Sequence, residues 1–259
     1  MKAETISNLL EFATDIAWHA GRLTLAHFQT GVAVERKSNA SPVTLADRDA
    51  ERYLRERIEE RFPHDGIVGE EFGAVREGAA RRWIIDPIDG TRTFVHGVPL
   101  YGVLVALEAG DDVQLGVIHL PALDETVCAA TGNGCWWNSR RARVSTTASL
   151  DHALVLATSV ENLERSGDRE GWDGLRAHVE MCRTWGDCYG YALVATGRAE
   201  AMIDGRLALW DAAAVAPIVR EAGGIVTDVA GEPSHRNGSL IATNSALGEP
   251  IRRLLRRSA

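Results

Sequence analysis

Hydrophobic residues recur every three or four positions at the start of the chain. They are Ile6, Leu9, Leu10, Ala13, Ile16, Ala17, Ala20 and Leu23. This period predicts an amphipathic helix of roughly six turns. A second helix is predicted from about Thr44, because Thr44 and Asp47 have the spacing of an N-cap residue and its reciprocal partner. Leu54, Ile58 and Phe62 are expected to form its buried stripe.

The pattern changes to strict alternation from Val103. Apolar residues occupy every second position in 103–107 and again in 113–117, on either side of a Gly-Asp-Asp turn. Two more strand-like segments, 126–130 and 135–137, flank Gly-Asn-Gly. Alternation with short polar turns predicts an antiparallel meander.

Short strand-like and helical segments follow one another after about residue 150. Strands are predicted at 153–157, 199–203 and 225–227, and helices near 170–182, at 187–197, at 212–222 and from about 246. Because strands and helices are segregated in runs, we predict an α+β fold of stacked layers rather than a doubly wound sheet. No Pro/Ser-rich linker interrupts the chain, so we predict one domain over residues 1–259, with any subdomain hinge near 145–150.

The composition limits the classes of function. Lys and Arg number 28 against 36 Asp and Glu, and this net charge of −8 argues against a general polyanion binder. No apolar run approaches the ~18 residues that span a bilayer, so we expect a soluble, unprocessed protein without a membrane partner. Four cysteines without a Cys-x-x-Cys pair indicate reduced thiols and a cytoplasmic location.

The segment 83–91, Trp-Ile-Ile-Asp-Pro-Ile-Asp-Gly-Thr, concentrates the candidate chemistry. Its first three residues read as a buried strand, and Pro87 predicts that the chain leaves the sheet just after Asp86. Asp89 and Gly90 form a predicted turn, after which backbone N–H groups at the start of a short helix are placed to face an anion. Asp86 and Asp89 are therefore placed to share a cation beside a phosphate.

Two alternatives apply to this segment. An ordinary strand-end turn also uses Asp-Gly. A haloacid-dehalogenase phosphatase ends a strand in a similar run, but it needs a nucleophilic Asp where Pro87 stands. Two further acidic sites favour the metal interpretation: Glu70 and Glu71 in a Gly-flanked break, and Asp211 before the apolar segment 212–222. Singly these are a solvated loop and an N-cap worth roughly 1 kcal/mol; together they predict a carboxylate site for hard cations.

In this combination the sequence resembles the inositol-monophosphatase superfamily of magnesium-dependent, lithium-sensitive phosphomonoesterases. The matching pieces are Gly69-Glu70-Glu71, the segment 86–91, Trp210-Asp211 with the segment 221–224, and the stretch 37–51. The resemblance covers nearly the whole chain. It implies a five-layer αβαβα sandwich of the inositol monophosphatase and fructose-bisphosphatase type, a homodimer, and a small phosphate monoester as substrate.

The resemblance also implies roles for the acidic residues. Glu70, Asp86 and the Ile88 carbonyl would hold a first Mg²⁺, and Asp86, Asp89 and Asp211 a second, giving two or three ions per site. Two cations about 3.5–4 Å apart suit phosphate hydrolysis, since they activate the nucleophile and stabilise the leaving oxygen.

The remaining implied roles concern the attacking water and the phosphate. Thr91, with Glu70 and Asp47, would position and deprotonate the water. The Gly90 and Thr91 N–H groups would bind phosphate oxygens. The capping role of Asp47 remains open beside its catalytic one.

Within the superfamily, the segments 183–191 and 197–202 look like the branch that dephosphorylates L-histidinol phosphate. Asp187 and Asp204 stand at substrate-facing positions, where acidic groups suit an ammonium and an imidazole. Both would also bind hydroxyls, and both have structural alternatives: a helix N-cap for Asp187 and a turn for Asp204. Trp185 suits imidazole stacking, a core or an interface, and His96 is interpreted as a structural histidine rather than a ligand.

Two other functions remain open. The first is an inositol monophosphatase or a broad-specificity sugar or nucleotide phosphatase of the same superfamily. The second is a non-catalytic module that binds RNA or the transcription machinery, which the basic tail at 252–257 would suit. Because arginines also suit the negative end of a helix and a binding module does not need the carboxylate set, we expect an enzyme without a nucleic-acid partner.

Overall fold

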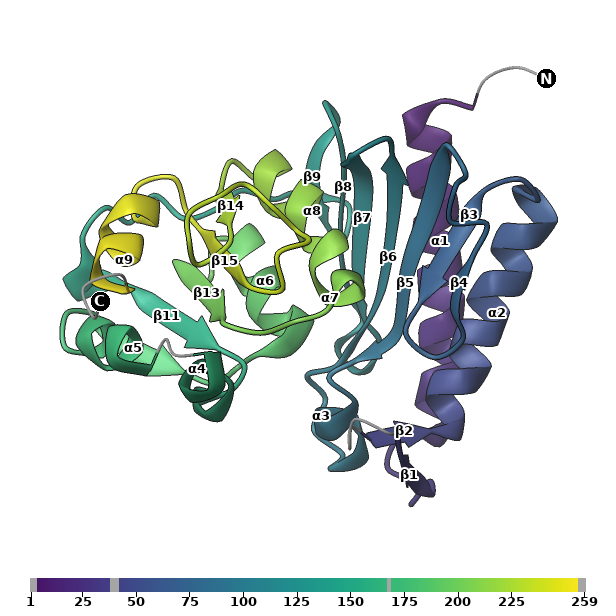
Figure 1. Cartoon of the computed structure of the whole chain (residues 1–259), viewed down its shortest axis with the longest axis horizontal. Coiled ribbons are helices and arrows are strands. Elements are labelled where there is room, and N and C mark those ends of the chain that lie inside the picture. Colours follow the sequence, from purple (N-terminus) through teal and green to yellow (C-terminus); the bar gives the residue numbers. More distant parts are fainter. Residues whose placement is uncertain (1–3, 38–41, 167–168, 256–259) are drawn as a thin grey trace.

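The chain folds into five layers in the order helix, sheet, helix, sheet, helix (Figure 1). The computed structural model describes residues 4–37, 42–166 and 169–255. The predicted layered α+β fold is therefore confirmed. Ser41 of the matching stretch and the last two arginines of the basic tail lie outside the described residues.

The first sheet is mostly antiparallel and contains the predicted meander. Among the described residues its strand order is β10 (Arg140–Arg141), β9 (Gly134–Trp137), β8 (Glu125–Ala130), β7 (Asp112–Leu120), β6 (Gly102–Ala109), β5 (Arg81–Asp89), β3 (Gly66–Gly69) and β4 (Gly73–Val75). Within the described part of this sheet, only β3 and β5 run parallel. Strand β5 is buried on both faces, which explains its continuous apolar run: Ile84 faces the second sheet's side and Ile85 faces the outer helices.

Two long helices cover the outer face of this sheet. They are α1 (Ile6–His27) and α2 (Leu45–Arg61). Thr44 and Asp47 form the predicted capping box of α2. A short hairpin of β1 (Val34–Arg36) and β2 (Pro42–Thr44), not predicted from the sequence, precedes this helix.

The middle layer lies between the two sheets. It consists of α6 (Asp187–Ala195), α7 (Leu209–Ala213) and α8 (Val215–Glu221). The predicted continuous helix at 212–222 is thus two short helices, and Asp211 is the third residue of α7 instead of its N-cap. The junction packs tightly on β7, since a Cβ on Gly116 would lie 2.1 Å from the Ala214 carbonyl oxygen.

The second sheet carries the outermost helices. In the described chain its order is β12 (Met181–Arg183), β11 (Leu154–Ala157), β13 (Ala201–Asp204), β15 (Leu240–Thr243) and β14 (Ile225–Thr227). Its outer face packs on α4 (Val160–Ser166), α5 (Arg169–Arg176) and α9 (Gly248–Leu255). The helix predicted near 170–182 ends at Arg176, because residues 181–183 pair with β11 as an edge strand.

The remaining elements connect these layers. They are the short helix α3 (Thr91–Val95) and two single 3₁₀ turns, η1 (Pro121–Leu123) and η2 (Leu150–His152). The helix after Gly90 was predicted. The connection between the two sheets, residues 142–153, includes the predicted hinge at 145–150, which stays a prediction. The four cysteines are free, as predicted. Among the described helices, none is both long and apolar enough to cross a membrane.

Candidate active site

Three carboxylates from distant parts of the chain meet at the end of β5. One oxygen each of Asp86, Asp89 and Asp211 lies within 4.8 Å of the others, and we call this group the acidic cluster. Asp86 and Asp89 come from β5 of the first sheet, and Asp211 comes from α7 of the middle layer. The structure therefore brings together three of the predicted metal ligands.

A β-bulge explains how two residues of one strand reach the same cluster. The predicted exit of the chain after Asp86 is wrong, because β5 continues to Asp89. Asp86 pairs with Leu104 and Asp89 with Gly102, and the register shifts between these pairs. In a regular strand, residues three apart face opposite sides, so the extra residue turns both carboxylates to one side. Pro87 lies in this bulge, where a missing N–H is tolerated.

Backbone N–H groups hold each carboxylate of the acidic cluster in place. The Ile88 N–H donates to Asp86 Oδ1 at 3.0 Å. The Cys188 N–H, at the start of α6, donates to Asp89 Oδ2. The Ala208 N–H donates to Asp211 Oδ2 at 2.7 Å. Asp86 and Asp211 are thus held by N–H groups two or three residues away in the sequence. Asp89 is held by an N–H group from the second half of the chain.

Burial and neighbouring negative charges disfavour ionisation of the acidic cluster. Burial, together with the charge of Glu70, raises the pKa of Asp86 well above its usual range. Burial and the nearby Asp187 do the same to the pKa of Asp89, and burial raises the pKa of Asp211 to about 7. Buried like charges disfavour ionisation, and a divalent cation would offset both effects. Oxygen donors of this kind fit Mg²⁺.

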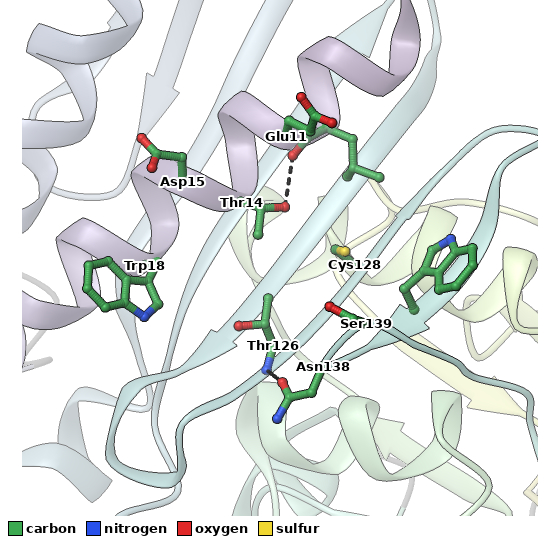
Figure 2. Close-up of a pocket in the computed structure, with 10 residues that line it drawn as sticks. Glu11, Thr14, Asp15, Trp18, Thr126, Cys128, Asn138 and Ser139 are labelled. Carbon is green, nitrogen blue, oxygen red and sulfur yellow. Dashed lines mark hydrogen bonds between the residues drawn. The ribbon is translucent and has the colours of Figure 1, made fainter.

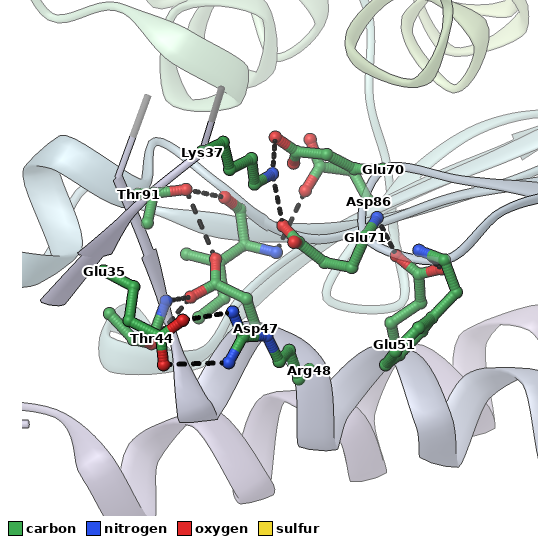
Figure 3. A network of polar contacts seen from close by, with 12 residues as sticks. Glu35, Lys37, Thr44, Asp47, Arg48, Glu51, Glu70, Glu71, Asp86 and Thr91 are labelled. Carbon is green, nitrogen blue, oxygen red and sulfur yellow. Dashed lines mark hydrogen bonds and ion pairs between the residues drawn. The ribbon is translucent and has the colours of Figure 1, made fainter. Parts of the chain in front are cut away.

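Glu70 and Glu71 lie in the turn between β3 and β4, beside the acidic cluster. The Lys37 Nζ contacts Glu70 Oε1 at 2.7 Å and Glu71 Oε1 at 2.6 Å (Figure 3). Burial raises the pKa of Glu71 to about 7, although Lys37 opposes the shift. In this structure Glu70 contacts an ammonium group, so its role as a metal ligand and in water activation stays a prediction.

Asp47 combines its capping role with a contact in the site. It accepts from the Thr44 N–H at 2.7 Å and from the Thr44 hydroxyl at 2.6 Å. Its other oxygen lies 3.3 Å from Thr91 Oγ1, which is also 3.1 Å from the Ile88 carbonyl oxygen (Figure 3). Burial raises the pKa of Asp47. The Thr91 hydroxyl is thus oriented by two acceptors beside the acidic cluster.

Glu51 supports the turn that carries Glu70 and Glu71, and the sequence reasoning missed this contact. It is fully buried on α2 and accepts from the N–H groups of Glu71 at 2.7 Å and Phe72 at 3.1 Å (Figure 3). It also pairs with Arg55 at 2.8 Å. A Cβ on Gly69 would lie 2.2 Å from its carboxylate, which explains the glycine before Glu70. Its position on the same helix face as Leu54 and Ile58 was the available signal of burial.

Asp187 lies between the acidic cluster and α3. Its Oδ2 accepts from the Thr93 hydroxyl at 3.1 Å and would lie 2.9 Å from a Cβ on Gly90. Burial, with nearby Asp204, raises the pKa of Asp187 to about 6. It is the first residue of α6 and not the N-cap, which is Gly186. The structure therefore places Asp187 in the site and not in a capping contact.

Asp204 ends β13 as a buried residue and not in an exposed turn. Its carboxylate accepts from the Tyr191 hydroxyl at 2.7 Å, the Thr158 hydroxyl at 3.1 Å and the Thr158 N–H at 3.2 Å. Burial raises the pKa of Asp204. Both carboxylate oxygens of Asp204 already accept hydrogen bonds from the protein, which favours a structural role in the wall of the site over direct contact with a substrate.

A cavity of about 130 Å³ connects these acidic groups. Its lining includes Asp89, Asp187, Asp204 and Asp211. A neighbouring cavity of about 290 Å³ shares Asp187 and Thr158 and extends to His96. His96 is exposed on that wall and is not a core histidine. Trp185 is 41% exposed, so the core interpretation of this residue is wrong for the single chain.

A larger cavity of about 750 Å³ lies between α1 and strands β8 and β9 (Figure 2). Trp18, Cys128 and Asn138 line it, and none of its lining residues belongs to the acidic cluster. Its carboxylates, Glu11 and Asp15, are exposed on one helix. This cavity lacks a convergent set of buried acidic groups, so size alone does not identify the active site.

Comparison with known proteins agrees with this geometry. A family model described as "Inositol monophosphatase family" matches residues 5–258. The chain is 46% identical over 244 residues to a histidinol-phosphatase of Chlorobaculum parvum, covering 93% of this chain and 94% of that protein. It is 35% identical over 235 residues to a fructose-1,6-bisphosphatase/inositol-1-monophosphatase of Thermotoga maritima, covering 87% of each.

The fold comparison gives the same result. The crystal structure of extragenic suppressor protein suhB from Bartonella henselae superposes with a TM-score of 0.91 at 30% identity, covering 97% of this chain and 100% of that one. These similarities confirm the resemblance inferred from the acidic motifs, including its histidinol-phosphatase branch. A carboxylate cluster suited to phosphate-ester hydrolysis, on this fold and in this sequence context, has one consistent explanation: the chain belongs to the inositol monophosphatase family and is a phosphomonoesterase.

Proposed function

We propose that the protein hydrolyses L-histidinol phosphate to L-histidinol and phosphate with the aid of Mg²⁺. The observation that carries this proposal is the cavity that joins the acidic cluster to a second acidic wall containing Asp187. A phosphate monoester with a cationic organic part complements both ends. The similarity to the Chlorobaculum parvum histidinol-phosphatase supports the same substrate.

The proposed roles of the site residues follow from their contacts. Glu70, the acidic cluster and the Ile88 carbonyl would hold two or three Mg²⁺ ions, which supply positive charge to the phosphate and its leaving oxygen. Thr91, held by Asp47 and the Ile88 carbonyl, positions the attacking water. Glu70 and Asp47 accept its proton. The N–H groups of Gly90, which is the N-cap of α3, and of Thr91, its first residue, bind phosphate oxygens.

Asp187 is the proposed contact for the substrate ammonium group. An Asp187→Asn substitution should lower kcat/KM for L-histidinol phosphate by about 10- to 100-fold, because a charge-assisted hydrogen bond is lost. The effect on myo-inositol 1-phosphate should be smaller, since its hydroxyls also bind an amide. Thr93→Val, which removes a hydrogen bond of Asp187 but no charge, is the matched control. Equal losses on both substrates would contradict the assignment.

The central experiment compares phosphate release from L-histidinol phosphate and myo-inositol 1-phosphate with added Mg²⁺. We expect a higher kcat/KM for L-histidinol phosphate, since specificity is the ratio of these values. A preference for the inositol ester would overturn the substrate and leave the metal site in place. The similarity to the Thermotoga maritima enzyme makes an inositol or sugar phosphate the second candidate.

A further inference from the structure

A cluster of charged side chains joins the two sheets through Glu108 of β6. Glu108 is only 1% exposed. Arg82 is its partner residue in the pairing of β5 with β6. Both Nε, at 2.8 Å, and Nη2 of Arg82 donate to Glu108 Oε2. Arg236 forms an ion pair with Oε1, and His235 Nε2 lies 3.5 Å from the same oxygen, although neither Oε1 nor Nε2 has a hydrogen bond to the described residues. We call these four residues the Glu108 cluster.

The Glu108 cluster differs from a surface ion pair. A buried carboxylate loses its hydration and is tolerated only with well-placed partners, whereas an exposed pair contributes little. Burial lowers the pKa of His235, so this imidazole is neutral at pH 7 and the two arginines supply the positive charge. The contact of Arg236 with Glu108 therefore constrains where the segment between β14 and β15 docks on the first sheet.

This segment is internally braced and reaches the active site. Asp228 accepts from Asn237 Nδ2 at 2.7 Å and from the Glu232 N–H at 2.8 Å. The Gly238 carbonyl then accepts from the Leu207 N–H at 2.9 Å. Leu207 lines the active-site cavity, and the next residue, Ala208, donates its N–H to Asp211.

The other side of the Glu108 cluster leads to the same place. Arg82 lies on β5, four residues before Asp86, and the same strand ends in Asp89. The cluster thus links the strand that carries two members of the acidic cluster to the segment that holds the third. The direct packing of α7 on β5 also contributes to the relative position of Asp211.

We propose that the Glu108 cluster is a positioning element: it holds Asp211 against Asp86 and Asp89 and thereby sets the affinity of the site for divalent metal. This inference rests on the proposed function insofar as Mg²⁺ is the ion bound. Partners that orient metal ligands commonly change metal affinity by about 10- to 100-fold when they are removed. Arg236 is the member to change, because it is 37% exposed at the side chain and its replacement burdens folding least.

The test measures Mg²⁺ binding by calorimetry without substrate, and the Mg²⁺ dependence of turnover, in three variants. Arg236→Ala should weaken Mg²⁺ binding about tenfold while kcat at saturating Mg²⁺ stays within about twofold of wild type. Arg236→Lys should restore part of the affinity. Arg220→Ala is the control, because Arg220 of α8 pairs with Asp112 of β7 at 3.1 Å and so joins the middle layer to the first sheet through a pair that includes neither Glu108 nor Arg236.

Three outcomes would overturn the proposal. They are wild-type affinity in Arg236→Ala, an equal loss in Arg220→Ala, and the absence of Mg²⁺ binding by the wild-type protein. If Arg236→Ala does not fold, Arg236→Gln, which keeps the length of the side chain better, takes its place under the same criteria. Wild-type protein that binds Mg²⁺ but does not hydrolyse L-histidinol phosphate would refute the substrate and leave this inference standing.

Discussion

Asp89 ends β5, lies in the acidic cluster and accepts the N–H of Cys188 from the second half of the chain. An Asp89→Asn substitution keeps the shape but removes the negative charge needed by a cation. We expect turnover to fall by about 10²- to 10³-fold, as for other preorganised electrostatic groups. The fold should persist, because a neutral amide avoids both the burial of a charge and the repulsion by Asp187 that together raise the pKa of this carboxyl.

The measurement pairs phosphate release with circular dichroism and thermal unfolding. Asp112→Asn, the same chemical change at an exposed aspartate, should retain activity. Residual turnover of Asp89→Asn near the wild-type rate would contradict the metal assignment.

Single residues also show what sequence reasoning can and cannot find. Asp86, Asp89 and Asp211 were predictable, because each stands beside a local signal, a bulge proline, a turn glycine or the start of an apolar helix. Lys37 and Glu51 were not, since their roles depend on contacts with a turn some 20 to 34 residues away. The helix face of Glu51 signals its burial, but no local pattern names the groups that Glu51 and Lys37 contact.

At the scale of elements, α1 packs unusually closely on β7. A Cβ on Gly21 would lie 2.5 Å from His119, which is 2% exposed and hydrogen-bonded to the Thr126 hydroxyl at 2.8 Å. Burial lowers the pKa of His119 to about 4. The unfolded chain, with a histidine pKa of about 6.5, then binds the proton more tightly than the folded one. The stability that comes from burying His119 as a neutral imidazole is therefore present above pH 6.5 and is lost as the pH falls toward 4.

The resulting prediction concerns acid stability. Between pH 7.5 and pH 5, His119 should cost the wild-type protein about 2 kcal/mol of unfolding free energy, given these pKa values. His119→Gln should show a correspondingly smaller decrease, measured by urea unfolding at both pH values. His152→Gln, at an exposed histidine, should keep the wild-type decrease. Parallel decreases in all three proteins would contradict the role of His119.

Element boundaries followed the strength of the local pattern. The long α1 and the meander were predicted closely, because many positions repeat the same period. The strands β12 and β15 and the helix α4 were missed, since three to seven residues give too few periods to recognise. Strand β5 extended past Pro87 only because its partner β6 accommodates a bulge, which is a property of the pair and not of either segment.

At the scale of the whole molecule, the acidic cluster lies where the two halves meet. Asp86 and Asp89 come from the first sheet and Asp211 from the middle layer, so a bound cation would join the halves as well as serve chemistry. A ligand that binds only the folded state stabilises it by about 2.7 kcal/mol when its concentration is 100 times Kd. For a chain of this size, that corresponds to a rise in Tm of roughly 5–10 °C.

We therefore expect millimolar Mg²⁺ to raise the Tm of the chelator-treated protein, and we expect Asp211→Asn to lose this rise while folding normally without metal. Differential scanning calorimetry with and without Mg²⁺ checks both. Asp173→Asn, the same chemical change at an aspartate of α5 that pairs with Arg169, should keep the Mg²⁺ response. If Mg²⁺ leaves the Tm of the wild-type protein unchanged, the cation does not bridge the two halves. This result would contradict the assignment of Asp211 as a metal ligand.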